Sequence, residues 1–390
     1  MDIPLCTVLF DGRKEKATAA LFCPVADEDQ LKGFVTTVKK LEDHKKVDYL
    51  FLYRKGFMVN HKSGLFNGLS AIHAVENLPL GSSGAFFVGT YALFREGYEV
   101  ILIADTDAIP SSKRMLLVLL QKALKLHKVI VPFNIPKEST APAKNYVINQ
   151  WGAFPRSVFE KAGFYTPYMW RGGEDYDFMT RLNKSGLLLQ LTNVFIYHPR
   201  AGYTIFHKMV EKKKFYPYVA GLMKVFLFHS ERDLFAALKF FAWFMFYAFF
   251  GDAFSDRDIF MMLSKCNQFT TEYNFTEPIS KVEIKRIKNR AAFQSSFFDK
   301  ILKEPKLLIS LLIFKKAYVY TDEIRLKMSR VGLFAGMLKA LFLVPFRFAQ
   351  AVLAFMKWKK ERKKVVYPVT PNNSEMAIKI YTKLVMEGRL

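Results

Sequence analysis

The chain has 390 residues, 51% of them hydrophobic and 24% charged, which is enough for one large domain with an appendage or for two domains. Three scattered cysteines, Cys6, Cys23 and Cys266, exclude a disulfide framework or a zinc cluster and fit a reducing compartment. The net charge of +23 divides into +6 over residues 1–200 (25 Lys and Arg, 19 Asp and Glu) and +17 over residues 201–390 (33 and 16). A basic second half calls for an anionic partner, such as a membrane surface or nucleic acid.

The first part of the chain alternates strands and helices in the manner of a doubly wound sheet. Apolar runs predict strands at Thr7–Phe10, Ala17–Cys23 and Asp48–Tyr53, and the spacing of apolar residues predicts a helix at Gln30–Leu41. Gly81–Gly97 is predicted to be a small-residue loop running into an apolar helix. Such a loop lets backbone N–H groups approach a phosphate, although close packing of the helix start explains it equally well.

Two carboxylates follow the next strand. Val100–Ala104 is apolar and β-branched, as buried parallel strands are, and it stops at Asp105-Thr106-Asp107. Ligands of open α/β sheets bind at the carboxyl ends of the strands. Oxygen ligands placed there suit Mg²⁺ or Mn²⁺ bridging to a diphosphate, whereas an isolated Asp-x-Asp is also a common helix cap.

Two further polar sequences follow at the ends of predicted elements. After a helix at Met115–Leu126 with Ser111 as N-cap and a strand at Val129–Pro132, an aromatic stretch leads to Arg171–Gly186, RGGEDYDFMTRLNKSG. There Glu174-Asp175 opens a predicted helix that ends at Gly186. The next predicted strand, Leu187–Tyr197, ends at His198. The ordered series of Asp-x-Asp, Glu-Asp and His is what favours a catalytic site over simple capping.

These residues resemble family 2 glycosyltransferases with the GT-A fold, over roughly residues 17–200 and most specifically from 81 to 200. The resemblance implies a Rossmann-like, mostly parallel sheet and transfer of a sugar from a nucleotide diphosphate with inversion at the anomeric carbon. It implies that Asp107, Asp105 and His198 contact the metal and that Asp175 is the general base. We assign donor contacts to Pro24, Val25, Arg54, Lys55, Gly84 and Asp105, and acceptor contacts to Trp151, Gly152, Trp170, Gly173 and Glu174.

One departure from the family pattern concerns the donor base. The second strand of the family commonly ends in acidic residues that help hold the base, whereas this chain has Tyr53-Arg54-Lys55. The base, whether uracil, guanine or thymine, therefore stays open at this point. Arg54 and Lys55 are a hypothesis for phosphate contacts.

The second half is apolar and basic. Leu234–Gly251 is apolar almost all round but shorter than a membrane span needs, so it is either buried or shallowly embedded. In Val331–Met356 the polar residues Lys339, Arg347, Gln350 and Lys357 fall on one stripe, as in a helix lying in a membrane interface. Basic clusters at 357–364 and 281–290 suit anionic headgroups.

We therefore predict a GT-A nucleotide-sugar-binding and catalytic domain over residues 1–205, followed by a helical, basic, membrane-associating region over residues 206–390. No secretory leader is apparent in MDIPLCTVLFDGRKEK, so the protein is expected on the cytoplasmic face of a membrane, peripheral or monotopic. The acceptor is expected to be lipid-linked or a glycan.

Several alternatives stay open at this stage. A retaining GT-A transferase and a nucleotidyltransferase also place an Asp pair at a strand edge, and a membrane scaffold with an inactive transferase domain is a different class. Nucleic acid is not expected as a partner, because the aromatic residues lie in apolar runs instead of interleaving with basic ones. Sugar, acceptor and oligomeric state are not fixed by these patterns.

Overall fold

The computed structural model describes residues 2–57, 64–106, 108–110, 112–135, 148–197, 215–229, 316–320 and 325–390. Asp107, Ser111, His198, Cys266 and the segments 234–251 and 281–290, all singled out above, lie outside the described residues.

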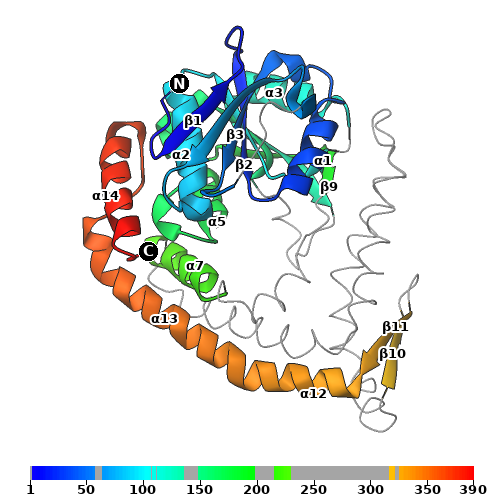
Figure 1. Ribbon diagram of the computed structural model, residues 1–390, viewed down its shortest axis with the longest axis vertical. Helices are drawn as coiled ribbons and strands as arrows, with labels where there is room; N and C mark the ends of the chain where they lie inside the picture. The colour runs from blue at the N-terminus through cyan, green and yellow to red at the C-terminus, as the bar shows by residue number, and fades with distance from the viewer. Residues whose placement is uncertain are drawn as a thin grey trace.

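A nine-stranded sheet forms the centre of the fold, in the order β1-β4-β3-β2-β5-β8-β7-β9-β6 (Figure 1). Its four parallel neighbours are β4 (Ser70–Glu76), β3 (Val47–Tyr53), β2 (Ala19–Val25) and β5 (Val100–Ala104). β8 (Gln150–Pro155) is inserted antiparallel between β5 and β7 (Val129–Ile135), which pairs in parallel with β9 (Leu188–Tyr197). β1 (Cys6–Asp11) and β6 (Ile109–Pro110) close the two edges antiparallel to their neighbours. This mixed sheet, parallel through its centre, confirms the predicted α/β class.

Helices cover both faces of the sheet, and the alternation of side chains along each strand divides the core accordingly. In β2, Ala20 and Phe22 face the layer of α2 (Gly81–Arg95), α4 (Arg156–Ala162) and α5 (Glu174–Lys184). Leu21 and Cys23 face the layer of α1 (Glu28–Val38) and α3 (Met115–Leu126). Strands buried on both faces have the continuous apolar sequences from which they were predicted.

The structure adds detail to these local predictions and corrects one of them. The strands predicted at Thr7–Phe10 and Ala17–Cys23 are present as β1 and β2, which pair with β4 and β3 and not with each other. Gly81 already begins α2, so the expected small-residue loop is the first turn of that helix. Three elements were not predicted. β4 is a parallel neighbour of β3, and β8 and α4 lie in the aromatic stretch before Arg171.

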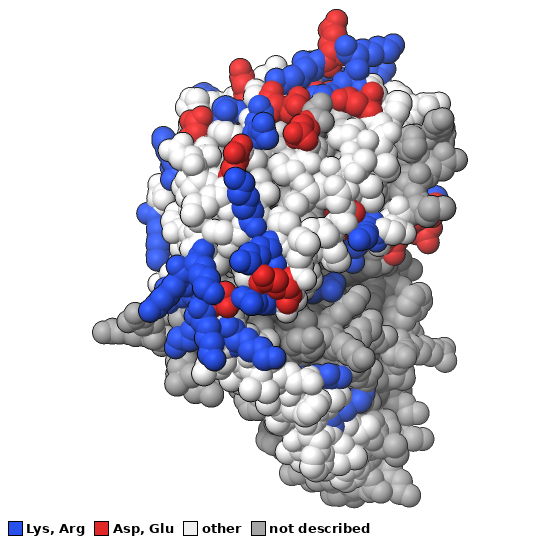
Figure 2. All heavy atoms as spheres, turned by 60° about the vertical axis from the view of Figure 1, so that its left-hand side comes forward, with Lys and Arg blue, Asp and Glu red and all other residues white. Residues whose placement is uncertain are grey.

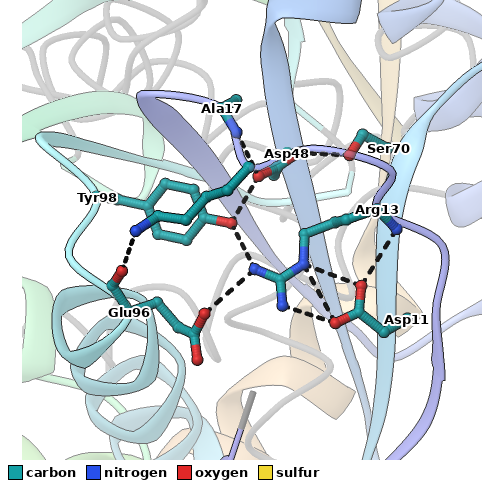
Figure 3. Close-up of polar contacts among 8 residues, drawn as sticks. Asp11, Arg13, Ala17, Asp48, Ser70, Glu96 and Tyr98 are labelled. Atoms are coloured by element: carbon teal, nitrogen blue, oxygen red, sulfur yellow. Dashed lines mark hydrogen bonds and ion pairs between the residues drawn. The ribbon is translucent and has the colours of Figure 1, made fainter.

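Polar side chains join the β1–β2 connection to the amino-terminal edge of the parallel strands (Figure 3). Asp48, 1% exposed, accepts hydrogen bonds from the Tyr98 hydroxyl at 2.6 Å, the Ala17 N–H at 3.0 Å and the Ser70 hydroxyl. Arg13 donates to Tyr98 at 3.0 Å and pairs with Asp11. Because this network lies at the amino ends of β3 and β4, opposite the edge where ligands bind, we interpret it as structural.

The described part of the second half consists of helices and one hairpin. They are α7 (Phe215–His229), the hairpin of β10 (Lys316–Tyr320) and β11 (Arg325–Ser329), α12 (Arg330–Leu338), a π-helical turn at Lys339–Leu343, α13 (Val344–Glu361) and α14 (Ser374–Met386). The helix predicted over Val331–Met356 is present as α12, the π-helical turn and α13, and it extends to Glu361.

The end of the chain returns to the sheet domain and packs against α2. Tyr381 of α14 is fully buried, and its hydroxyl donates to the carbonyl of Leu80. A Cβ atom at Gly84 would occupy the space of the Tyr381 ring, so a glycine is needed there for close packing. Trp358, Val369, Ala377 and Leu384 belong to the same core as Phe22. Residues beyond 350 thus complete a core that begins in β2.

Candidate active site

A pocket of about 240 Å³ opens at the carboxyl ends of the parallel strands. Pro24, Val25, Arg54 and Asp105, four of the predicted donor contacts, line it. Its other lining residues come from the same strand ends, from α1 and from the first turns of α2: Ala26, Gln30, Leu52, Glu76, Gly81, Ser82, Ala85, Phe86 and Thr106. The Arg54 N–H donates to the Val25 carbonyl at 3.4 Å, so two of these strand ends are tied together. The pocket lies where open α/β sheets bind ligands.

A bulge in β8 shapes the loop that carries Asp105. Ile103 pairs with Gly152 but Ala104 pairs with Gln150, so Trp151 is the extra residue, in a left-handed conformation with φ of 62°. The Trp151 indole is fully buried and donates to the Ala108 carbonyl at 2.9 Å. The Asp105 N–H donates to the Asn149 carbonyl at 3.0 Å. A strained, buried tryptophan therefore fixes the chain on both sides of Thr106.

The sequence Arg171-Gly172-Gly173 brings α5 close to α2. Both glycines have positive φ, 77° and 91°, which other residues rarely adopt. A Cβ atom at Gly173 would collide with Val225 of α7, and one at Gly81 would collide with the backbone of Trp170. The Ser82 hydroxyl, which lines the pocket, hydrogen-bonds the Glu174 carboxylate. The start of α5 is thus held directly beside the pocket.

Glu174 and Asp175 both have raised pKa values. Burial and the neighbouring charge of Asp175 raise the pKa of Glu174, which is 6% exposed. Burial also raises the pKa of Asp175, although the Tyr176 N–H donates to its carboxylate at 2.8 Å and acts in the opposite direction. The first turn of a helix favours the ionised form of an acid, but desolvation outweighs this effect at Asp175.

Three predicted carboxylates converge on one buried tyrosine. Burial raises the pKa of Tyr165, and the negative charges of Asp175, Asp105 and Glu174 raise it further, so all three acids lie near this ring. The Tyr165 hydroxyl donates to the Asn149 side chain at 2.7 Å, and its ring stacks on the pocket residue Phe86 at 5.2 Å. The charges of acids that are about 70 residues apart in sequence therefore act on the same buried hydroxyl group.

The remaining predicted contacts are placed as follows. Lys55 is exposed and Gly84 lies under Tyr381, and neither is among the residues that line the pocket. Trp151 is a core residue with no exposed surface, and Gly152 lies against the Ile148 carbonyl. Trp170 is partly exposed, with φ of 67°. The donor and acceptor roles of these residues stay predictions.

Of the three predicted metal ligands, only Asp105 lies among the described residues, since Asp107 and His198 lie outside them. Within those residues, no three His, Cys, Asp or Glu side chains are grouped as a metal site. Asp105 lies at the pocket with its carboxylate at the end of β5, and a hard oxygen ligand at that place fits a divalent cation beside a diphosphate.

Asp177 is a third acid of α5 and has a structural role. It is fully buried and binds Thr166 at 2.7 Å, Arg181 at 3.0 Å, His229 of α7 at 2.7 Å and Tyr367 at 2.9 Å. Burial opposes its ionisation, but Arg181, His229 and Thr166 together lower its pKa to about 2. The Asp177 carboxylate, two residues after Asp175, therefore connects α5 to the segments that carry Thr166, His229 and Tyr367.

Several site residues were missed from the sequence. Glu76 ends β4, in which the β-branched residues Ile72 and Val75 were a usable signal for a strand. Arg171 lies near Arg54 and Glu174, since the positive charge of Arg54 lowers its pKa in addition to burial. Asn149 and Tyr165 gave no signal, because their importance depends on the bulge and on contacts between distant segments.

No protein-family model and no curated protein matches the sequence. Solved structures similar to it include glycosyltransferases. The mannosyltransferase PcManGT from Pyrobaculum calidifontis, in complex with GDP-Man and Mn²⁺, is 11% identical with a TM-score of 0.40 over 85% of this chain and 89% of that chain. S. aureus TarS 1–349 with UDP-GlcNAc is 10% identical, with a TM-score of 0.37 over 66% and 89%. GalNAc-T7 with UDP, GalNAc and Mn²⁺ is 12% identical, with a TM-score of 0.40 over 75% and 58%. Similarities this distant do not assign an activity to this chain.

Proposed function

We propose that this protein is a metal-dependent, inverting glycosyltransferase of the family 2 type. It moves a sugar from a nucleotide-diphosphate sugar to a hydroxyl or phosphate acceptor, which is lipid-linked. The observation that carries the proposal is the pocket at the carboxyl edge of the sheet: Asp105 and Ser82 line it, and Ser82 hydrogen-bonds Glu174, which is followed by Asp175. A structural cap needs no such gathering of acids from two segments.

The chemistry assigned to Asp175 is removal of the proton from the acceptor hydroxyl. As that oxygen bonds to the anomeric carbon, the bond from this carbon to the diphosphate oxygen breaks and the nucleoside diphosphate leaves with the electron pair. A single base opposite the leaving group gives inversion. A raised pKa makes Asp175 a stronger base than an ordinary aspartate, provided that it is ionised.

The leaving diphosphate carries the negative charge that develops in the reaction. A divalent cation, Mn²⁺ or Mg²⁺, would be held by Asp105, Asp107 and His198 and would supply charge neutralisation there. Arg171 lies near Glu174, which hydrogen-bonds the pocket residue Ser82. Its guanidinium lowers the cost of an anion in that region.

Metal-dependent nucleotide binding tests the proposal. We expect titration calorimetry with UDP, GDP and dTDP to show one nucleotide binding far better with Mn²⁺ than without it. Asp105→Ala should weaken that binding at least about tenfold, since it removes a charged ligand. Asp29→Ala, which removes an exposed acid on α1, is the matched control. If none of the three nucleotides binds with metal present, the proposed function fails.

Product analysis separates the related enzymes. An inverted anomeric configuration in the product supports the proposal, whereas retention indicates a retaining transferase. Release of pyrophosphate from a nucleoside triphosphate indicates a nucleotidyltransferase.

We also propose that α12 and α13 dock the protein on an anionic membrane, which would be the cytoplasmic leaflet. Among the described residues, Phe334–Lys364 is a 31-residue helix long and apolar enough to cross a membrane by length and composition. One face packs on the protein through Ala340, Val344, Ala351 and Trp358. The opposite face exposes large apolar side chains: Phe334, Leu338, Leu341, Phe342, Phe346, Leu353 and Met356. Such a two-faced helix suits an interface.

Basic residues adjoin this apolar face. Lys357, Lys359, Lys360, Lys363 and Lys364 are exposed at the end of α13, and Figure 2 shows Lys and Arg side chains gathered on the side of the molecule where α13 meets α14. Each basic residue near an anionic membrane surface contributes about 1 kcal/mol. The arrangement supports a peripheral or monotopic attachment.

Vesicle binding checks the docking surface. We expect the variant with Phe342→Glu and Phe346→Glu, whose side chains are 70% and 56% exposed, to lose binding to phosphatidylserine-containing vesicles, by about tenfold for each phenylalanine. The matched control carries Met376→Glu and Met386→Glu, two exposed apolar residues of α14. Unchanged flotation of the phenylalanine variant would contradict docking through this face. Deleting residues 330–390 would not test membrane binding alone, because Tyr381 and Leu384 belong to the core and their loss would destabilise the fold.

A further inference from the structure

Glu76 is a buried acid in the pocket that the proposed chemistry does not use. It ends β4, is 7% exposed, and shares the pocket wall with Leu52 and Phe86. Burial raises the pKa of its carboxyl group. An acid in such surroundings costs free energy unless N–H donors face it. The backbone N–H groups of Leu80 and Lys55 already donate to it, but a carboxylate accepts about four hydrogen bonds and still has room for a ligand.

Glu76 lies several strands away from Asp105, the residue predicted to bind the metal. β4 and β5 have β3 and β2 between them, so their carboxyl ends are three strand spacings apart, roughly 14 Å. Glu76 therefore marks one end of the pocket and Asp105 the other. A nucleoside diphosphate that has its phosphates at Asp105 and extends along the pocket would reach Glu76 with its base.

Arg54 gives the base end a second charged group. It follows β3, the strand adjacent to β4, and its positive charge lowers the pKa of Glu76, so the two groups are close. A carboxylate only accepts hydrogen bonds and a guanidinium only donates them. The base end of the pocket therefore offers both an acceptor and a donor, and apolar residues such as Leu52 and Phe86 also line the pocket.

The edges of the bases match this pair unequally. Guanine presents two adjacent donors, N1–H and the N2 amino group, next to the O6 acceptor, so a carboxylate can bind both donors while a guanidinium binds O6. Uracil and thymine have one donor between two carbonyl groups, which places a carbonyl against the carboxylate. Adenine has an unprotonated N1 where guanine has N1–H, and this nitrogen would face the carboxylate.

We propose that the donor is a guanine nucleotide, with Glu76 accepting from N1–H and the N2 amino group and Arg54 donating to O6. The proposal rests on the proposed glycosyltransferase function and names its donor class. Glu76 and Arg54, at the end of β4 and directly after β3, are then specificity residues.

Titration of the full-length protein with five diphosphates and Mn²⁺ tests the donor class. GDP is expected to bind most tightly, ahead of UDP, dTDP and ADP. Inosine diphosphate lacks only the 2-amino group and is expected to bind at least about tenfold more weakly than GDP, because one hydrogen bond to a charged group is lost. This comparison needs no variant.

A substitution tests the residue. Glu76→Gln is expected to weaken GDP binding and to shift the preference toward xanthosine diphosphate, whose second carbonyl accepts from an amide. Glu28→Gln, on the exposed side of α1, is the matched control and is expected to bind GDP as the unmodified protein does.

The outcomes distinguish the two proposals. Tighter metal-dependent binding of UDP or dTDP than of GDP overturns the guanine assignment and leaves the glycosyltransferase proposal standing. Equal binding of GDP and inosine diphosphate, or unchanged GDP binding by Glu76→Gln, overturns the contact to Glu76. Absence of binding by all five overturns the proposed function itself.

Discussion

Asp177→Asn is expected to lower the free energy of unfolding by about 3–5 kcal/mol, because removing one partner of a buried ion pair leaves the other charge uncompensated. The substitution preserves shape but removes the charge that balances Arg181, which then stays buried without its counter-ion. It also weakens the link from α5 to His229 and Tyr367. Urea denaturation followed by circular dichroism measures the loss.

The control and the pH dependence make this prediction specific. Asp29→Asn removes an acid that is 97% exposed and should change stability by less than about 0.5 kcal/mol. Because the folded-state pKa of Asp177, about 2, lies below its ordinary value of 3.8, its contribution is complete above pH 4 and is lost as the pH falls toward 2. That difference corresponds to about 2 kcal/mol. A variant as stable as the unmodified protein at pH 7 would refute the assigned role.

Asp175→Asn is expected to reduce kcat by about 10²–10⁴-fold while nucleotide binding changes little, because the amide keeps the shape of the side chain but cannot take the acceptor proton. Sugar transfer under saturating donor and Mn²⁺, with calorimetry of the nucleotide alongside, separates these two effects.

The pH profile gives a second readout for Asp175. Since burial raises its pKa, the activity of the unmodified protein should decline on acidification at a pH above the ordinary value of 3.8 for an aspartate. The residual activity of Asp175→Asn should lack this decline. If the variant kept activity within about tenfold, or kept the same acid limb, another group would be the base.

Elements that depend on local pattern were predictable from the sequence. β3, β5 and α3 are apolar runs with clear ends, and the structure places them within one residue of the expected bounds. Asp105, Glu174 and Asp175 could be singled out for the same reason, since each lies next to the end of such an element.

Features set by contacts between distant segments were not predictable. No local pattern indicates that a bulge between two antiparallel strands buries Trp151 in the core. Nor does any local pattern indicate that Tyr381, almost 300 residues later, packs on Gly84. The partners of Asp177 include His229 and Tyr367, whose proximity no local pattern encodes.

The return of α14 to α2 constrains the order in which the protein can fold during synthesis. Domains usually fold as they emerge from the ribosome, amino-terminal part first. Here the layer that covers Leu80 and Gly84 is supplied by Tyr381, so the sheet domain stays without one part of its core until translation has passed that residue. A fragment ending near residue 205 would expose this apolar surface of α2 to water, together with the side of Tyr168 that contacts Tyr381. Such a nascent chain is expected to need chaperones to remain soluble.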